Sequence, residues 1–155
     1  MGIFNWLQKK PRLPLEVVRA ADMGDETAKQ KLQEAFDNGM TADEHNELRW
    51  EAYKSLAEQG DAVSQYWIGF LYSMEKRDRE KTIYWYELSA SQGNTDAMWG
   101  LVLGYGEYVN ILNPTPNIGP VPLGYDIEKE IYWLKKANEC GDLRAMFECI
   151  ERGLI

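Results

Sequence analysis

An eight-residue phrase that occurs twice constrains the fold of this chain more than any other feature. Residues 78–85, DREKTIYW, and residues 126–133, DIEKEIYW, share six identities at an offset of 48 residues. In both copies a glycine follows the tryptophan by eight residues, at Gly93 and Gly141. A weaker copy, residues 43–50, keeps the spacing from aspartate to tryptophan and leads to Gly60. Repetition at this period predicts an array of similar supersecondary units.

A second pattern begins at each glycine and predicts a helix-turn-helix junction. The glycine ends one helix, the Asp or Asn that follows caps the next, and a small residue at position four lets two helix backbones approach closely. Positions eight and twelve after the glycine continue this predicted core face. The four junctions are Gly24-Asp25-Ala28, Gly60-Asp61-Ser64, Gly93-Asn94-Ala97 and Gly141-Asp142-Ala145; the later positions are Leu32, Ile68, Leu101 and Cys149, then Phe36, Tyr72, Tyr105 and Gly153.

Proline placement and helical spacing of apolar residues predict an all-α chain. Residues 15–113 contain no proline and are rich in good helix formers, whereas Pro114, Pro116, Pro120 and Pro122 cluster late. The sequence Thr41-Ala-Asp-Glu44 is typical of a capping box. We expect helices near residues 14–23, 25–38, 42–59, 61–74, 78–92, 94–107, 126–140 and 142–152.

Two segments fall outside the repeated pattern. Residues 108–125 are an insertion loop that is unusually apolar, and we expect it to fold over part of the helical surface. Residues 1–13 are an N-terminal extension in which apolar side chains precede Lys9 and Lys10. It is expected to cap the first helix or to be disordered; contact with an anionic membrane surface is the alternative.

The phrases at residues 55–72 and 84–93 resemble the Sel-one-like repeat, a relative of the tetratricopeptide repeat. The resemblance covers roughly residues 14–152, is weakest in the first repeat, and leaves the insertion outside. It implies a right-handed superhelix of about three and a half helix pairs, in a domain over residues 14–155, with a concave side that binds other proteins. Some secreted members carry a cysteine pair in each repeat, whereas this chain has only Cys140 and Cys149.

Charge and composition exclude several functional classes. The formal net charge is −8, so the chain lacks the positive footprint that nucleic-acid binding requires, and a basic protein partner is expected instead. No run of about 18 apolar residues predicts a membrane span, and the order of apolar and charged residues at the start is not that of a secretory signal. We therefore expect a cytoplasmic protein, with Cys140 and Cys149 as buried free thiols.

Residues that could carry catalysis or hold a cofactor have simpler structural interpretations. His45, the only histidine, is expected to be solvated at a helix start. The carboxylate pairs Glu44/Glu47 and Glu128/Glu130 fit the wet face of amphipathic helices. Trp50, Trp85 and Trp133 occupy equivalent places and are predicted to wedge into the core between stacked helix pairs. No catalytic, metal or cofactor site is predicted.

A strip of apolar residues is the best candidate for a binding surface. Positions six and ten after each junction glycine lie opposite the predicted core face, and in the first pair they are Gln30 and Glu34. Exposed aromatic residues at such positions mark binding surfaces. The alternative is that the next repeat or the insertion loop buries them. The candidate partner-binding residues are Tyr66, Phe70, Trp99, Leu103 and Phe147.

These observations favour a non-enzymatic interaction module that holds a protein partner in its concave groove. A small acidic chain of this kind suggests an inhibitor or immunity protein for a toxin, or a regulatory adaptor. One alternative is a hydrolase-type enzyme that uses Cys140 or a carboxylate pair. Another is a structural subunit that self-associates through its last repeat, which ends in Arg152-Gly-Leu-Ile155.

Overall fold

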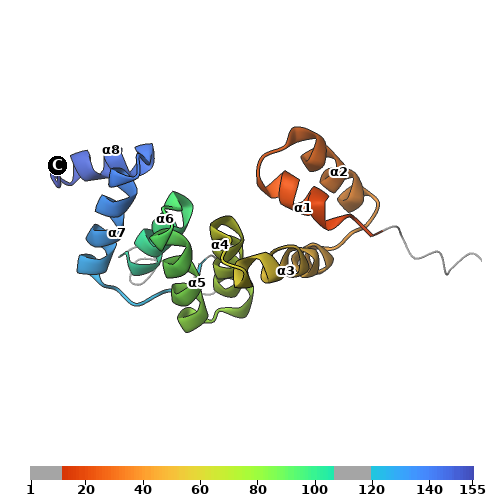
Figure 1. Ribbon diagram of the computed structural model, residues 1–155, viewed down its shortest axis with the longest axis horizontal. Helices are drawn as coiled ribbons and strands as arrows, with labels where there is room; N and C mark the ends of the chain where they lie inside the picture. The colour runs from red at the N-terminus through yellow and green to blue at the C-terminus, as the bar shows by residue number, and fades with distance from the viewer. Residues whose placement is uncertain (1–11, 107–119) are drawn as a thin grey trace, which may run out of the picture. The chain divides into compact units, whose positions relative to one another are not determined.

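The computed structural model describes residues 12–106 and 120–155, and over these residues the fold is all-helical, without a β-strand (Figure 1). The eight expected helices are all present, and most boundaries differ from the prediction by one residue. Residues 1–11 of the extension and 108–119 of the insertion loop lie outside the described residues. The helices are α1 (Leu15–Asp22), α2 (Glu26–Asp37), α3 (Ala42–Glu58), α4 (Ala62–Leu71), α5 (Arg79–Ser91), α6 (Thr95–Tyr105), α7 (Ile127–Glu139) and α8 (Leu143–Glu151).

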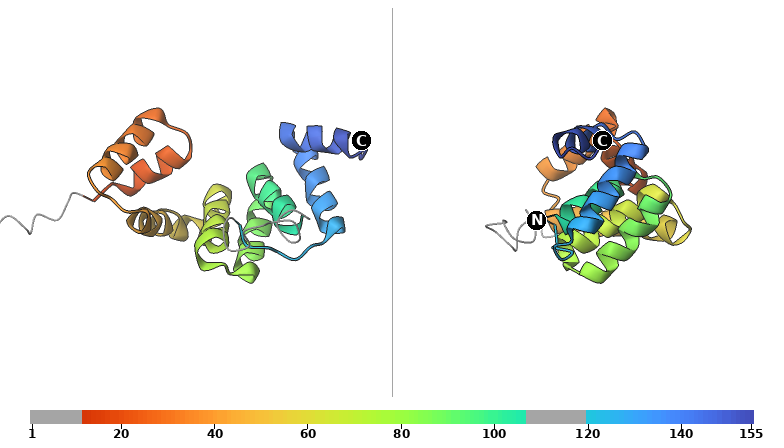
Figure 2. Two further views of the ribbon diagram at one scale, coloured as in Figure 1. Left: turned by 180° about the vertical axis from the view of Figure 1, so that it is seen from behind. Right: turned by 90° about the vertical axis from the view of Figure 1, so that its left-hand side faces the viewer.

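The chain forms two compact units, residues 1–52 and residues 53–155. In the first unit α1 packs against α2, and Arg49, near the middle of α3, forms an ion pair with Asp22. In the second unit each helix from α4 to α8 packs against the next, and α4 also contacts α6, as the two orientations in Figure 2 allow the reader to follow. The core of the second unit is built mainly from α5, α6, α7 and α8.

The four predicted junctions share one geometry. Gly24, Gly60, Gly93 and Gly141 all have positive φ values, between 84° and 99°, which only glycine adopts without strain. The side chain that follows each glycine accepts a hydrogen bond from the backbone N–H of the small residue, at 2.7 to 3.1 Å. All four small residues are buried, as predicted. They are Ala28, Ser64, Ala97 and Ala145.

Three of the first helices of the pairs, α3, α5 and α7, also begin with a side-chain cap. Asp78 accepts a hydrogen bond from the backbone N–H of Lys81 at 3.0 Å, and Asp126 does the same with Lys129 at 3.1 Å. In both places the lysine Nζ also forms an ion pair with Oδ2 of the aspartate, at 3.4 Å for Lys81 and 3.6 Å for Lys129. At the start of α3 the backbone N–H of Thr41 donates to Glu44 at 2.7 Å, which completes the capping box.

The insertion leaves the contact between successive helix pairs unchanged. The backbone N–H of Asp78 donates to the carbonyl of Tyr72 at 3.1 Å, and that of Asp126 donates to the carbonyl of Tyr105 at the same distance. In both places a first-turn lysine lies over the tyrosine ring, at 5.0 Å for Lys81 and 4.9 Å for Lys129. Tyr105 and Asp126, which flank the insertion, therefore keep the geometry of the uninterrupted repeat.

The described end of the insertion folds onto the helices. The backbone N–H of Val121 donates to Ser73 Oγ at 3.0 Å, and that of Leu123 donates to the carbonyl of Gly104 at 2.9 Å. Val121 and Leu123 are both buried. For this part of the insertion, the prediction that it covers helical surface is confirmed.

One local departure from the predicted helices follows α4. Residues Tyr72–Lys76 form a π-helical turn, η1, where an α-helix to residue 74 was predicted. Arg77 then adopts a left-handed conformation with φ 50°. This conformation turns the chain so that the next residue, Asp78, can bond back to the Tyr72 carbonyl. The π-turn and Arg77 thus form the short link between the second helix of one pair, α4, and the first helix of the next, α5.

The three equivalent tryptophans are less deeply placed than predicted. Trp50, Trp85 and Trp133 are half-buried rather than enclosed in the core. Trp85 and Trp133 meet the tyrosine before them edge to face, with ring centroids 5.1 and 5.0 Å apart and the same interplanar angle of 78°. The repeat therefore extends to side-chain geometry, although these rings lie at the edge of the core.

Candidate partner-binding surface

The predicted strip lies on the second helices of three pairs, all within the second unit, but its members differ in exposure. Leu103 and Phe147 are exposed, with 44% and 60% of their surface accessible. Tyr66, Phe70 and Trp99 are half-buried and pack against the core. Of the two possibilities that the sequence left open, exposure holds for Leu103 and Phe147, and partial burial holds for the other three. Neighbouring helix pairs cover part of each ring.

Tyr66 and Phe70 on α4 belong to a continuous aromatic contact. The Tyr66 ring stacks on Tyr86 of α5, with centroids 5.9 Å apart and an interplanar angle of 18°. Phe70 meets Trp67 edge to face at 5.6 Å, and Trp67 stacks on Tyr53 of α3 at the same distance. Burial raises the pKa of Tyr86, so its hydroxyl stays neutral. Position six of this pair is therefore an inter-repeat contact as well as a candidate binding position.

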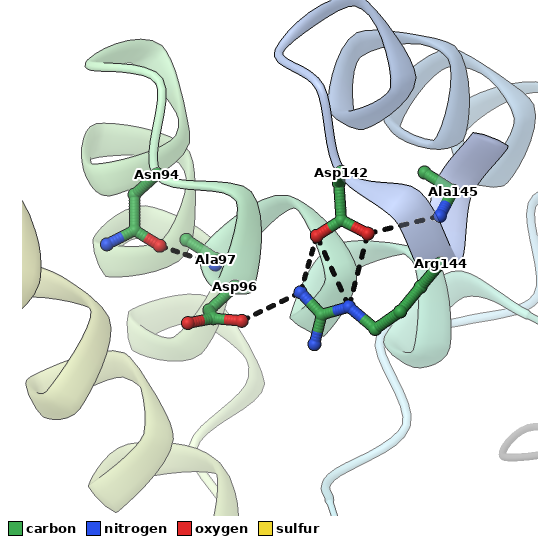
Figure 3. Close-up of polar contacts among 6 residues, drawn as sticks. All are labelled: Asn94, Asp96, Ala97, Asp142, Arg144 and Ala145. Atoms are coloured by element: carbon green, nitrogen blue, oxygen red, sulfur yellow. Dashed lines mark hydrogen bonds and ion pairs between the residues drawn. The ribbon is translucent and has the colours of Figure 1, made fainter. Parts of the chain in front are cut away.

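Trp99 on α6 is covered on one face by a cation from the following pair. The Arg144 guanidinium carbon lies 5.3 Å from the centroid of the Trp99 ring. Arg144 Nη2 also bonds Asp96 at 2.8 Å and Asp142 at 2.6 Å (Figure 3). Leu103, one turn after Trp99, keeps its side chain exposed.

The carboxylate of Asp142 both caps α8 and binds the guanidinium of Arg144. One oxygen accepts from the backbone N–H of Ala145 and so caps α8, and both oxygens accept from the Arg144 guanidinium (Figure 3). The hydrogen bonds from Arg144 lower the pKa of Asp142 to about 2, against the opposing effect of burial. The same guanidinium pairs with Asp96 of α6, so these charge-assisted bonds link the start of α8 to α6.

Phe147 belongs to an exposed apolar stripe of its own helix. Leu143 and Ile150, four residues before it and three after, are exposed as well. Residues with this spacing share one side of an α-helix. Leu143 and Ile150 were not predicted as surface residues, although their helical spacing from Phe147 is visible in the sequence. Arg144 was not predicted either, because its contacts depend on which helix pairs meet.

Two residues that were considered as possible catalytic groups differ from their expected environments. His45 is buried, 8% exposed, and meets Phe36 edge to face at 5.4 Å; the expectation of a solvated histidine is wrong because α2 covers the ring. Burial lowers its pKa, and the charge of Arg49 acts in the same direction. Glu130 is also buried, and it pairs with Arg152 at 2.8 Å instead of lying on the wet face.

Both cysteines are free, but only Cys149 is buried. Cys140 is exposed and directly follows the last residue of α7. The prediction of two buried thiols is therefore wrong for Cys140. Within the described ranges, no three His, Cys, Asp or Glu side chains gather in a way that could hold a metal ion.

Two further findings concern membrane-spanning helices and similarity to known proteins. The longest helix in the described parts, α3, has 17 residues, and none there combines the length and hydrophobicity that a bilayer crossing needs. No family model matches this chain, and no curated protein or solved structure shows significant similarity to it.

Proposed function

We propose that this chain is a non-enzymatic interaction module built from Sel-one-like helix pairs. In this proposal about three and a half pairs form a right-handed superhelix, and its concave groove holds a protein partner. The binding residues are Tyr66, Phe70, Trp99, Leu103 and Phe147.

One observation carries the proposal. Large apolar side chains remain partly exposed on helices that caps and close packing hold in place. The junction caps and buried small residues hold α4, α6 and α8 firmly. Leu103 and Phe147 nevertheless expose large apolar surfaces. Rigid presentation lowers the entropy cost of binding, because few side chains must be ordered on association. Half-buried Phe70 and Trp99 supply rings that are already held in place.

The partner is expected to be basic. The chain carries a formal net charge of −8, which attracts cations over a distance of about 8 Å at physiological salt. An inhibitor or immunity protein for a toxin and a regulatory adaptor are the roles that fit an acidic module of this size. The identity of the bound protein distinguishes between them.

The experiment combines capture from the native host with affinity measurements. The immobilised full chain captures proteins that mass spectrometry identifies, and calorimetry then measures the affinity of the identified protein. We expect Leu103→Ala to weaken binding about tenfold, whereas Glu128→Ala, an exposed control on α7, leaves affinity unchanged. The affinity should also fall as salt concentration rises. Equal affinities for the wild type and Leu103→Ala would remove this surface from the proposal.

The enzymatic alternative has its own test. A cysteine nucleophile reacts as the thiolate, so a thiol probe would label Cys140 rapidly below pH 7 if its neighbours activated it. We propose that Cys140 has no catalytic role, and we expect a thiol probe to label it only slowly at pH 6. Rapid labelling at pH 6 would favour the enzymatic alternative.

A further inference from the structure

The last described helix, α8, is apolar on two sides. Its inner side carries Ala145 and Cys149, which are fully buried. Its outer side carries Leu143, Phe147 and Ile150, which are 65%, 60% and 55% exposed. We call these three residues the α8 stripe. A stripe of large apolar side chains on one helix face is typical of an interaction surface.

The equivalent face of α4 is covered by the helix pair that follows it. Ser89 Oγ of α5 donates to the Ala62 carbonyl at 2.6 Å, and Tyr86 of α5 stacks on Tyr66. Gly69 lies so close to the Tyr86 ring that a Cβ there would be 2.6 Å from it. Ala62, Tyr66 and Gly69 stand at the same distances from their junction glycine as Leu143, Phe147 and Ile150 do from theirs. The α8 stripe therefore continues a packing interface that is already used within the fold.

We propose that the α8 stripe binds the same stripe of a second copy, with the two α8 helices antiparallel about a twofold axis at Phe147. In this arrangement Leu143 of one copy lies near Ile150 of the other, so apolar groups meet along the whole stripe. A twofold pairing uses one self-complementary patch on both copies. The inference does not rest on the proposed groove, and because both proposals bury Phe147, the dimer and the groove partner would compete for this side chain.

Charge on the flank of the stripe selects the antiparallel direction. Arg144 lies near the start of α8 and Glu151 at its end, and both are exposed. Arg144 Nη1 takes no part in the contacts to Asp96 and Asp142 drawn in Figure 3. Antiparallel helices place Arg144 of each copy beside Glu151 of the other, which forms two ion pairs. Parallel helices related by a twofold axis would place the charged flanks of the two copies on opposite sides of the contact, where these ion pairs cannot form.

Sedimentation equilibrium of the full chain from about 1 µM to about 1 mM tests the dimer, in about 0.15 M salt to screen the net charge. We expect a monomer–dimer equilibrium. Phe147→Glu should raise the dissociation constant at least tenfold, and Glu151→Arg should raise it severalfold. Glu128→Arg is the matched charge control and should have no effect. Near-ultraviolet circular dichroism of each variant verifies that the monomer remains folded.

A crosslink tests the position of the axis. In a Cys140→Ser background, Phe147→Cys places a thiol on the proposed axis, and mild oxidation should give a covalent dimer. Leu103→Cys, an exposed apolar position on α6, is the control and should remain monomeric. A monomer at every concentration, growth beyond dimers, a dimer insensitive to Phe147→Glu or Glu151→Arg, or no crosslink at position 147 would each overturn the proposal.

Discussion

The guanidinium carbon of Arg144 lies 5.3 Å from the centroid of the Trp99 ring, so a cation from the following helix pair occupies one face of that ring. A cation–π contact at a partly exposed site contributes about 0.5–1 kcal/mol. Asp96 and Asp142 hold the same guanidinium. Trp99 therefore joins two helix pairs, and its side chain contributes to stability independently of any partner.

Because of this contact, alanine substitutions of Trp99 and of Leu103 should lower the free energy of unfolding by different amounts. Trp99→Ala should destabilise the fold by about 2 kcal/mol, since a half-buried ring and its contact with Arg144 are lost. Leu103→Ala should cost under about 1 kcal/mol, because the side chain is substantially exposed. Urea unfolding followed by circular dichroism gives both values. Equal losses for the two variants would contradict the separate environments described for them.

Acid should weaken the start of α8 through Asp142. Its pKa is about 2 in the folded chain and close to 3.8 when unfolded, so the stabilisation is fully present above pH 4. It is lost as pH falls from about 4 to 2, because protonation then removes the charge that Arg144 holds. The loss should be about 1–2 kcal/mol after allowing for solvent screening.

The variant Asp142→Asn isolates this effect from other carboxylates. Asn remains a good helix cap, as Asn94 shows at the equivalent junction. The variant should be less stable at pH 7, and the difference from wild type should shrink between pH 4 and pH 2. Unfolding midpoints in urea at a series of pH values measure this difference. A constant difference across that range would mean that Asp142 is not the titrating group.

The features that local rules determine were predictable from the sequence. Gly93 and Asn94 specify a junction through backbone freedom and one side-chain hydrogen bond, and neither depends on distant residues. The helices, their caps and the buried position of Ala97 follow from such rules. The segments that carry the candidate site were predictable for this reason.

The exposure of individual site residues depends on which helix pairs meet, and helical spacing does not contain that information. Tyr66 stands at a position opposite the core stripe, yet Tyr86 of the next pair stacks on it. His45 was expected in water because its neighbours in the sequence are charged, whereas Phe36 from the preceding helix covers it. The Arg144 contact to Asp96 spans 48 residues and was not predictable for the same reason.

Gly104 is required by the docked end of the insertion. A Cβ at this position would lie 2.5 Å from Leu123 Cγ and Cδ1, although the helix itself tolerates alanine well. Gly104→Ala should therefore destabilise the chain by about 1–3 kcal/mol, because the buried Leu123 must move.

A double-mutant cycle identifies the contact responsible. Leu123→Ala alone should cost about 2–4 kcal/mol through the cavity that it leaves. When Leu123→Ala is already present, adding Gly104→Ala should cost little, since the clash is gone. Thermal or urea unfolding of the four proteins gives the coupling energy. Additive effects would mean that residues 104 and 123 do not touch.

His45 should make stability fall below pH 6.5. Its folded pKa lies below the unfolded value of about 6.5, since burial disfavours the charged ring and Arg49 adds repulsion. The His45 ring is neutral in both states above pH 6.5, so the free energy of unfolding is at its full value there. Below pH 6.5 the unfolded chain binds a proton at His45 more readily than the folded chain does, so the free energy of unfolding falls. A pH titration of the His45 ring proton signal by NMR should give a pKa below 6.5.

The variant His45→Leu separates this titration from the packing of the ring. Nε2 of His45 has no hydrogen-bond partner among the described residues, so replacing the ring by an apolar side chain should leave stability unchanged or raise it by about 1 kcal/mol at pH 7. His45 is the only histidine, and exposed carboxylates titrate mostly below pH 5. Between pH 6.5 and 5 the stability of the variant should therefore be nearly constant, whereas that of wild type falls. If the free energy of unfolding changed equally with pH in both proteins over this range, His45 would be accessible to water and would contribute no pH dependence.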